Sequence, residues 1–267
     1  MKGCKMKTRI ISAVVAIAIA IPFIYLGGYP YKIAIGLIAL WSYKEIISLK
    51  KTHEKLPTVP MFLGLLGLLL IVFANTTYSL YYSGVSYIYL SVLCFGLIIP
   101  TLFYDNYSIK DAFHLIGLLL FIGLGFNSLI LVRNLDLKLF LYLVSIPVIT
   151  DSFALFSGKF FGKNKMCPNI SPKKTWEGCI GGSLFGTIIP CILYFILFKE
   201  FNFMIILITF ILTIMDQLGD LIFSKLKREN NIKDYSNIMP GHGGALDRLD
   251  SALVIFLTYV VLSLILL

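Results

Sequence analysis

The stretch SKLKRENNIKDYSNIMPGHGGALDRLDS, residues Ser224–Ser251, separates two long apolar segments at the end of the chain. The first segment covers residues 203–223 and the second covers residues 248–267. A helix needs about 20 apolar residues to cross the hydrocarbon core of a bilayer, and each segment has roughly that length. The pattern predicts two membrane-spanning helices joined by a loop that is rich in charge and glycine.

The rest of the chain follows the same pattern. It has 267 residues, of which 58% are hydrophobic and only 14% are charged, a composition typical of integral membrane proteins. About nine apolar segments have the length of a span, and they cover residues 10–28, 32–48, 58–75, 85–103, 112–132, 139–157, 179–198, 203–223 and 248–267. We therefore expect an all-α fold, a polytopic transmembrane helical bundle of about nine spans, as a single membrane domain over residues 1–267.

Lysine and arginine are distributed unevenly between the expected loops. Most of the 23 Lys and Arg residues lie before the first span, between the second and third spans, or in the loops near residues 158–176 and 224–246. An excess of Lys and Arg marks cytoplasmic loops. We expect a multi-pass protein of the inner (plasma) membrane of the cell, with the N-terminus and both late loops in the cytoplasm. There the net charge of +9 attracts anionic partners.

Five aspartates lie in or beside the last spans: Asp151, Asp216, Asp220, Asp247 and Asp250. An ionised side chain at the centre of a bilayer costs about 2.5–3.5 kcal/mol, so these residues are expected to face an interior cavity. Asp216 and Asp220 are four residues apart and share one helix face. Carboxylates beside basic loops suit Mg²⁺ and a polyphosphate. The pattern predicts one site, carried by residues 136–267, with residues 1–135 as scaffold.

Glycine has two expected roles in this half of the chain. Gly241, Gly243 and Gly244 precede the last span, where a glycine-rich backbone before a helix N-terminus can form an anion-binding nest. A second set is typical of a close helix-packing seam because its members are four residues apart; it consists of Gly178, Gly182 and Gly186.

The segment SPKKTWEG, residues 171–178, combines a helix-start signal with two cations. Ser171 before Pro172 predicts the start of a helix, which places Lys173 and Lys174 in its first turn. Lysine at that position opposes the helix dipole. A phosphate-facing role is therefore favoured over a structural one.

The residues of the opening stretch resemble the signature of the phosphatidate cytidylyltransferase family, also called CDP-diacylglycerol synthases. The residues that carry the resemblance are Ser224, Lys227, Arg228, Lys233, Asp234, Pro240, Gly241, His242, Gly243, Gly244, Asp247, Arg248 and Asp250. It extends to SPKKTWEG, to the run from Asp151 that ends in GKFFGK, and to the GDL at residues 219–221. The chain departs from the pattern at Phe223, where Glu is usual, at Phe153, where a small residue is usual, and at Ser236, where Gly is common.

The resemblance implies that CTP and phosphatidic acid, a lipid of the membrane, react to give CDP-diacylglycerol and pyrophosphate for phospholipid biosynthesis, with Mg²⁺. It implies a paired metal site at Asp220 and Asp247, to which we add Asp216; the second ion is left open. The expected catalytic residues are Asp220, Asp247, Lys227, Arg228 and His242. The expected substrate-binding residues are Asp151, Ser171, Lys173, Lys174, Ser224, Lys233, Asp234, Gly243, Gly244, Arg248 and Asp250. Nucleic acid is not an expected partner, and the oligomeric state is left open, with a homodimer as one option.

Two other functions fit parts of the pattern. An ion or solute transporter also carries aspartates inside the membrane, but the sequence shows no internal repeat with broken helices. A polyprenol-type lipid kinase would use a nucleotide and a lipid too, but it would release a nucleoside diphosphate and no pyrophosphate. A CDP-alcohol phosphotransferase is disfavoured because its Asp-Gly-x-x-Ala-Arg motif is absent from the sequence.

Overall fold

The structure is a computed structural model that describes residues 2–49, 56–74, 87–200, 202–236, 238 and 243–266. The chain divides into two compact units: Met1–Asn134 with Asp234–Arg248, and Leu135–Lys233 with Leu249–Leu267. In the described residues the secondary structure consists of nine α-helices, a single 3₁₀ turn and two short strands. The predicted all-α class is confirmed. That the chain acts as a single membrane domain stays a prediction.

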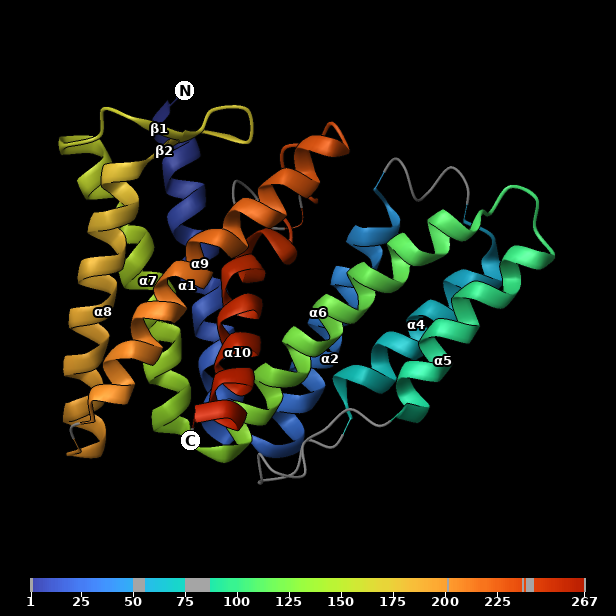
Figure 1. The fold of residues 1–267 in the computed structure, drawn as a ribbon, viewed down its shortest axis with the longest axis horizontal. Helices are drawn as coiled ribbons and strands as arrows, with labels where there is room; N and C mark the ends of the chain where they lie inside the picture. Colours follow the sequence, from blue (N-terminus) through green and yellow to red (C-terminus); the bar gives the residue numbers. More distant parts are fainter. Residues whose placement is uncertain are drawn as a thin grey trace. The chain divides into compact units, whose positions relative to one another are not determined.

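The first unit contains apolar helices (Figure 1). Its helices are α1 (Lys2–Leu26), α2 (Gly28–Ile47), α4 (Thr58–Val72), α5 (Tyr87–Ile98), which continues into the 3₁₀ turn η2 (Ile99–Leu102), and α6 (Ile109–Leu135). Helices α4 and α5 lie side by side because Gly67 removes a side chain from their contact. A Cβ atom at Gly67 would lie 2.7 Å from Leu93 Cδ1.

A buried amide fixes α6 against the end of α4. The Nδ2 atom of Asn127 donates hydrogen bonds to the carbonyl oxygens of Ile71, Val72 and Ala74, at 3.1, 3.2 and 2.7 Å. Ala74 N also donates to the carbonyl oxygen of Ile71 at 3.1 Å, but no residue of α4 itself can donate to these carbonyls, because they lie at or just beyond its C-terminus. The polar side chain therefore stabilises a helix end inside an otherwise apolar unit.

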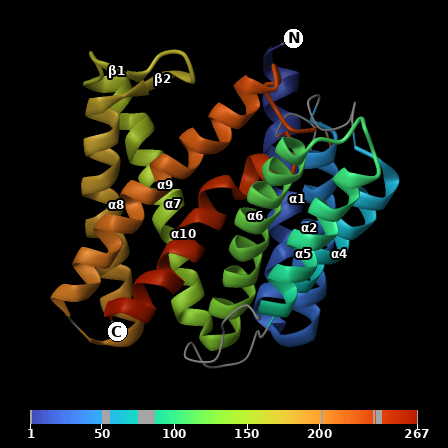
Figure 2. The ribbon, with the colours of Figure 1, turned by 45° about the vertical axis from the view of Figure 1, so that its right-hand side comes forward.

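The second unit consists of four long helices and a β-hairpin. Its elements are α7 (Leu137–Phe160), β1 (Lys165–Cys167), β2 (Ser171–Thr175), α8 (Trp176–Phe198), α9 (Phe203–Glu229) and α10 (Leu246–Leu266), whose first turn belongs to the first unit. The strands are antiparallel, with Lys165 opposite Thr175 and Cys167 opposite Ser171. Figure 2 shows the hairpin at the end of α7 and α8.

The predicted glycine seam is confirmed between α7 and α8. A Cβ atom at Gly182 would lie 2.9 Å from the Cβ atom of Ala154, and one at Gly186 would lie 2.2 Å from Oγ1 of Thr150. Residues without side chains let two membrane helices approach closely enough for dense packing. The seam holds the two helices that carry the hairpin.

Within the residues that the structure describes, five helices, α6 to α10, are long and apolar enough to cross a membrane by length and composition. Shorter apolar helical segments cover Val14–Leu26, Thr58–Val72 and Tyr87–Leu102. The protein is therefore a multi-pass membrane protein. All nine apolar segments of the sequence are helical in the structure over most of their length.

The predicted helix start at Ser171 is wrong. Residues Ser171–Thr175 form strand β2, and α8 begins at Trp176. The residue before a proline avoids the helical region, so Ser171 is extended. Thr175 caps the helix instead, because its Oγ1 atom accepts a hydrogen bond from Gly178 N at 3.1 Å. Lys173 and Lys174 therefore lie on a strand, and the argument from the helix dipole does not apply to them.

Helix α9 is longer than the sequence predicted. It continues beyond residue 223 to Glu229, since residues 224–229 contain neither Gly nor Pro. The helix ends at Asn230 and Asn231, and Asn231 has a positive φ of 58°. Ser224, Lys227 and Arg228 are consequently held on a rigid element instead of a loop.

Candidate active site

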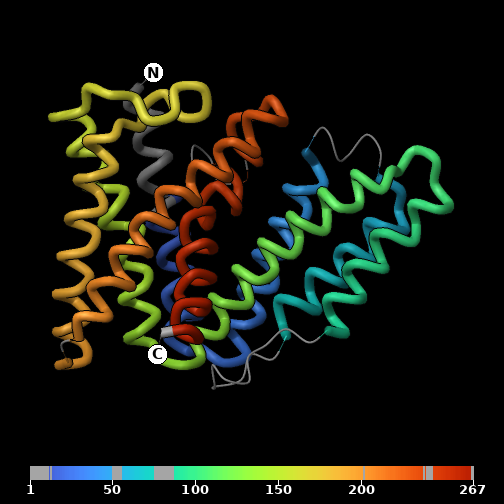
Figure 3. The backbone as a smooth tube through the Cα atoms, in the orientation of Figure 1, coloured from blue at the N-terminus to red at the C-terminus, as the bar shows by residue number. Residues whose placement is uncertain are grey.

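A cavity of about 350 Å³ lies in the second unit, where strand β2 meets α7, α8 and α9. Its polar lining consists of Asp151, Lys173, Lys174, Thr175, Gln217 and Asp220. The remaining lining residues are Ala154, Leu155, Met166, Gly178 and Cys179. The tube in Figure 3 can be followed through these elements by colour, from green α7 through the yellow hairpin and α8 to orange α9. The cavity brings four sequence-predicted residues together: Asp151, Lys173, Lys174 and Asp220.

An ion pair forms the centre of this cavity. The Nζ atom of Lys174 lies 2.6 Å from Oδ2 of Asp220, with the two side chains 24% and 32% exposed. Lys174 also donates to the carbonyl oxygen of Gln217 at 3.3 Å, and Ser224 Oγ donates to Oδ1 of Asp220 at 3.3 Å. Both carboxylate oxygens of Asp220 therefore have a donor, and the lysine is anchored by two acceptors.

Asp216 is a buried carboxylate one helical turn from this pair. It is 0% exposed, and neither of its carboxylate oxygens has a hydrogen-bond partner among the described residues. A buried polar group without a partner is rare, because it loses its hydration and gains nothing in return. Such an orphaned acceptor pair fits a position where a cation or a protonated group binds.

Four carboxylates of the second unit lie within range of one another's charge: Asp151, Asp216, Asp220 and Asp250. The nearby cations Lys174 and Lys227 offset this charge only in part. Within the described residues no group of three His, Cys, Asp or Glu side chains is close enough to hold a metal ion. Mg²⁺ commonly uses only one or two carboxylates, with water and substrate phosphates as its other ligands, so the oxygen-rich cluster still fits it.

The hairpin that carries the two lysines is held by Glu177, in the first turn of α8. Its carboxylate accepts hydrogen bonds from Lys163 N at 3.1 Å, Asn164 N at 3.2 Å and Asn164 Nδ2 at 2.8 Å. These bonds fix the start of the hairpin to the helix that follows it. Lys173 is exposed and Lys174 is half-buried at the cavity.

Arg228 and Lys227 occupy the last turn of α9. Arg228 Nη1 donates to Ile232 O at 3.0 Å and Nε donates to Ile170 O at 3.4 Å, which connects the hairpin to the segment after α9. Lys227 is buried, at 8% exposed. Lysine and arginine in the last turn also complement the helix dipole. Both residues therefore have a structural role beside the one that was predicted.

A tight turn precedes α10 in the first unit. Asp247 Oδ2 accepts hydrogen bonds from Tyr235 N at 2.8 Å and Gly244 N at 2.9 Å. Gly243 has a φ of +83°, and a Cβ atom on it would lie 2.7 Å from the same carboxylate oxygen. Glycine is required here by both the backbone angle and the space. The predicted residues Gly241 and His242 lie outside the described residues.

The anion at this turn is a carboxylate of the chain itself. Glu45, in α2, accepts hydrogen bonds from Ala245 N and Leu246 N, each at 2.9 Å, and from Ser236 Oγ at 2.6 Å. Together with the bond to Asp247, these bonds occupy the N–H groups of residues 244–246, so the N–H group of Gly244 in the predicted nest is taken by a carboxylate of the chain. Sequence reasoning missed Glu45, although a glutamate inside the apolar segment 32–48 was a signal for it.

The remaining predicted residues are more peripheral. Ser171 is at the start of β2 and does not line the cavity. Lys233, Asp234 and Arg248 are exposed. Phe223, the residue that replaces the usual Glu, is only 1% exposed and packs in the core, so it adds nothing to the polar lining.

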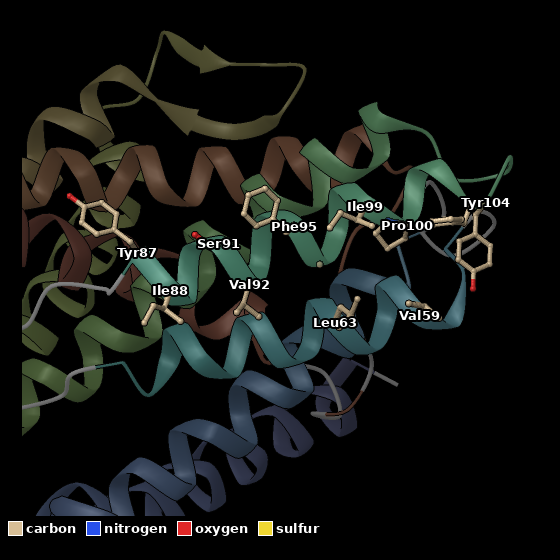
Figure 4. Close-up of a pocket in the computed structure, with 12 residues that line it drawn as sticks. Val59, Leu63, Tyr87, Ile88, Ser91, Val92, Phe95, Ile99, Pro100 and Tyr104 are labelled. Carbon is tan, nitrogen blue, oxygen red and sulfur yellow. The ribbon is translucent and has the colours of Figure 1, made fainter.

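A larger cavity, of about 710 Å³, lies between α4 and α5 (Figure 4). Side chains such as Leu63, Val92, Phe95 and Ile99 line it, and its only polar contributions come from Ser91 and two tyrosines. No charged residue lines it. Size alone therefore does not identify the site, because this cavity lacks the groups that could bind an anion or a metal.

A multi-pass helical protein with acidic and basic groups in one cavity is suited to binding charged molecules at a membrane. Comparison with known proteins makes this specific. The chain belongs to the cytidylyltransferase family, which matches residues 7–266. It is therefore a nucleotidyltransferase of lipid biosynthesis.

Similar proteins match the chain along nearly its whole length. The phosphatidate cytidylyltransferase of Staphylococcus haemolyticus is 35% identical over 250 residues, which cover 92% of this chain and 94% of that protein. The phosphatidate cytidylyltransferase of Bacillus subtilis is 36% identical over 260 residues, 94% of each chain. That of Staphylococcus aureus (strain COL) is 34% identical over 248 residues. The predicted family is confirmed.

Proposed function

We propose that this protein transfers the cytidylyl group of CTP to phosphatidic acid and so makes CDP-diacylglycerol and pyrophosphate. The observation that carries the proposal is the match of over 90% of the chain to relatives named phosphatidate cytidylyltransferase. The cavity at Lys174 and Asp220 supports the proposal, because its cationic groups suit the phosphates of a nucleoside triphosphate and its carboxylates suit a divalent cation.

The reaction is a displacement at phosphorus. A phosphate oxygen of phosphatidic acid bonds to the α-phosphorus of CTP, and the bond between that phosphorus and the oxygen leading to the β-phosphate breaks. The electron pair leaves with pyrophosphate. A phosphate monoester is largely ionised at pH 7, so no protein group is assigned as a general base.

Charged side chains have separate proposed roles in this reaction. Lys173 and Lys174 neutralise the triphosphate as it enters the cavity, and Lys227 and Arg228 offset the charge of the departing pyrophosphate. Bound Mg²⁺ would neutralise phosphate oxygens and so favour attack at phosphorus. Asp220, Asp216 and Asp247 are the proposed ligands, with a second ion of unassigned identity. The unpartnered oxygens of Asp216 support this assignment.

Other predicted residues keep their proposed roles in substrate binding. We assign His242 to catalysis. Substrate binding is assigned to Asp151, Ser171, Ser224, Lys233, Asp234, Gly243, Gly244, Arg248 and Asp250. The hydrogen bond of Gly244 N to Asp247 gives this glycine a second role, as the support of a carboxylate.

A cytoplasmic orientation of the site completes the proposal. CTP is a soluble anion and phosphatidic acid is a lipid, so the site has to meet both at the cytoplasmic membrane face. All nine helices are proposed to span the plasma membrane, with the N-terminus inside. In a variant without its five native cysteines, Asn169→Cys, at the exposed tip of the hairpin, should resist an impermeant thiol reagent in intact cells and react after lysis. Labelling in intact cells would show that the hairpin faces the outside and that the proposed orientation is wrong.

The function is tested with purified protein in detergent, CTP, Mg²⁺ and phosphatidic acid. Pyrophosphate and a CDP-lipid should appear in equal amounts, and replacement of phosphatidic acid by diacylglycerol should stop both, because diacylglycerol lacks the attacking phosphate. Consumption of CTP with diacylglycerol alone would indicate a lipid kinase. No consumption with either lipid, in a preparation that remains folded, would overturn the proposal.

A further inference from the structure

Glu45 is a buried carboxylate in the last turn of α2, in the first unit. It is 2% exposed, and among the residues that the structure describes no Lys, Arg or His forms an ion pair with it. A buried charge is tolerated only where strong hydrogen bonds replace its hydration. Its partners therefore explain why the residue is there.

Within the described residues, the hydrogen-bond donors to the Glu45 carboxylate are Ser236, Ala245 and Leu246. One carboxylate oxygen accepts from Ser236 Oγ at 2.6 Å and from Ala245 N at 2.9 Å, and the other accepts from Leu246 N at 2.9 Å. These N–H groups stand at the start of α10, where the helix itself provides no acceptor. Glu45 thus caps α10 from another helix, 200 positions earlier in the chain.

The next N–H group in the turn is held by Asp247. Gly244 N donates to Asp247 Oδ2 at 2.9 Å, so two carboxylates take three successive N–H groups. Gly244 also packs directly on Glu45. A Cβ atom at Gly244 would lie 2.2 Å from Glu45 Oε1 and 2.8 Å from Ser236 Oγ. The orientation of Asp247 therefore depends on a backbone that Glu45 fixes.

We propose that Glu45 is a positioning residue of the enzyme: it holds the turn before α10 and thereby sets the orientation of Asp247. Glu45 itself does not touch the substrate. The inference rests on the proposed function, in which Asp247 is a metal ligand. It connects a residue in the apolar segment 32–48 to the signature at the other end of the chain.

The first test measures hydrogen exchange and steady-state kinetics on the same Glu45→Gln variant. The amide of Gln keeps one acceptor oxygen but presents an NH₂ group to a backbone N–H, so one cap is lost at nearly constant volume. Hydrogen exchange should become faster at the backbone amides of residues 244–246 and should stay unchanged in α2 and α6. The kcat value should fall about 10–100-fold, as for other residues that orient a metal ligand, with KM for CTP little changed. Glu200→Gln, at an exposed glutamate, is the control and should change neither quantity.

The outcomes separate this inference from the proposed function. If the wild-type protein is active and the Glu45→Gln variant has unchanged hydrogen exchange and kcat, the proposed function stands and the inference is wrong. Faster exchange throughout the first unit also overturns it, because Glu45 would then be a general packing residue. A wild-type protein that shows no cytidylyl transfer overturns the proposed function and the catalytic part of the inference with it.

A second test uses the contact with Gly244 and does not depend on the folding of one variant. Gly244→Ala should lower kcat because the added methyl group displaces Glu45. In a protein that already carries Glu45→Ala, the same change should cost far less, since the nearest obstructing atoms are gone. Equal fold-changes in the two backgrounds would show that Glu45 and the turn do not act together.

Discussion

Two groups of carboxylates in this protein differ in what satisfies their oxygens. At the turn before α10, Glu45 and Asp247 accept hydrogen bonds from backbone N–H groups. In the second unit, Asp220 lines the cavity and pairs with a lysine, whereas Asp216 is fully buried and its carboxylate accepts no hydrogen bond within the described residues. Of these carboxylates, Glu45 accepts backbone hydrogen bonds at both oxygens and holds the chain, whereas Asp247 accepts them at Oδ2 and keeps its proposed role as a metal ligand beside Asp216 and Asp220.

The two groups of carboxylates also differ in the free energy that their burial costs. An unsatisfied buried polar group costs about 1–3 kcal/mol, and more when it is charged. Glu45 avoids that cost through its three hydrogen bonds, so replacing it should destabilise the protein. Asp216 does not avoid it, so replacing it should affect function more than stability.

The largest expected effect is at the ion pair of the cavity. Asp220→Asn should lower the rate of pyrophosphate release more than about 100-fold, because it removes a negative ligand for Mg²⁺ while keeping the side-chain shape. Steady-state rates at saturating Mg²⁺ measure this. Asp105→Asn, in an exposed loop, is the matched control and should remain fully active. An Asp220→Asn variant that retains a tenth of the activity would remove Asp220 from the proposed metal site.

The sharpest contrast between the two groups is expected from Asp216→Asn and Glu45→Gln. Asp216→Asn should lower activity about 10–100-fold but leave the thermal midpoint unchanged or raised, because a buried charge disappears. Glu45→Gln should lower the midpoint, because a cap is lost. Thermal unfolding in one detergent measures both. A fall of the midpoint in Asp216→Asn would mean that this carboxylate, too, holds the fold.

An intermediate effect is expected at Lys174. Lys174→Met removes the cation but keeps much of the apolar stem, so KM for CTP should increase about tenfold or more, which corresponds to at least 1.4 kcal/mol of binding. Lys173→Met, at the exposed neighbouring position, should raise KM less. Equal effects of the two changes would mean that the ion pair with Asp220 does not matter for CTP binding.

The smallest effect is expected at Ser236, the position where the family commonly has Gly. Ser236→Gly removes a single hydrogen bond to Glu45 and leaves the two backbone bonds in place. The loss of stability should be about 0.5–1.5 kcal/mol, with little change in kcat. A chemical denaturation curve compares it with Glu45→Gln. A larger effect than that of Glu45→Gln would reverse the proposed order of importance.

Sequence reasoning predicted the helices well and the turns poorly, for a physical reason. Apolar length is a local property, so each span could be read from its own residues. The hairpin was missed because Ser171–Thr175 becomes a strand only through pairing with Lys165–Cys167. Glu45 was missed because its partners lie 191 to 201 positions away.

Part of the site was nevertheless accessible to sequence reasoning. Asp151, Lys173, Lys174 and Asp220 were predicted from their chemistry, and the structure places all four in one cavity. The argument for the lysines used a helix that does not exist, yet the strand brings Lys174 to Asp220. The charge of these side chains was thus a better guide than the predicted local conformation.

The central claim is that the protein transfers the cytidylyl group of CTP, which contains the α-phosphorus, to a lipid. Isotopic labelling tests this claim most directly. Purified protein is given Mg²⁺, phosphatidic acid and CTP labelled with ³²P at either the α or the γ position, and the lipid is then extracted. The account predicts label in the lipid from α-labelled CTP, and label in pyrophosphate from γ-labelled CTP. Lipid that carries label from γ-labelled CTP would contradict it. So would lipid that carries no label from either form of CTP when the protein is folded.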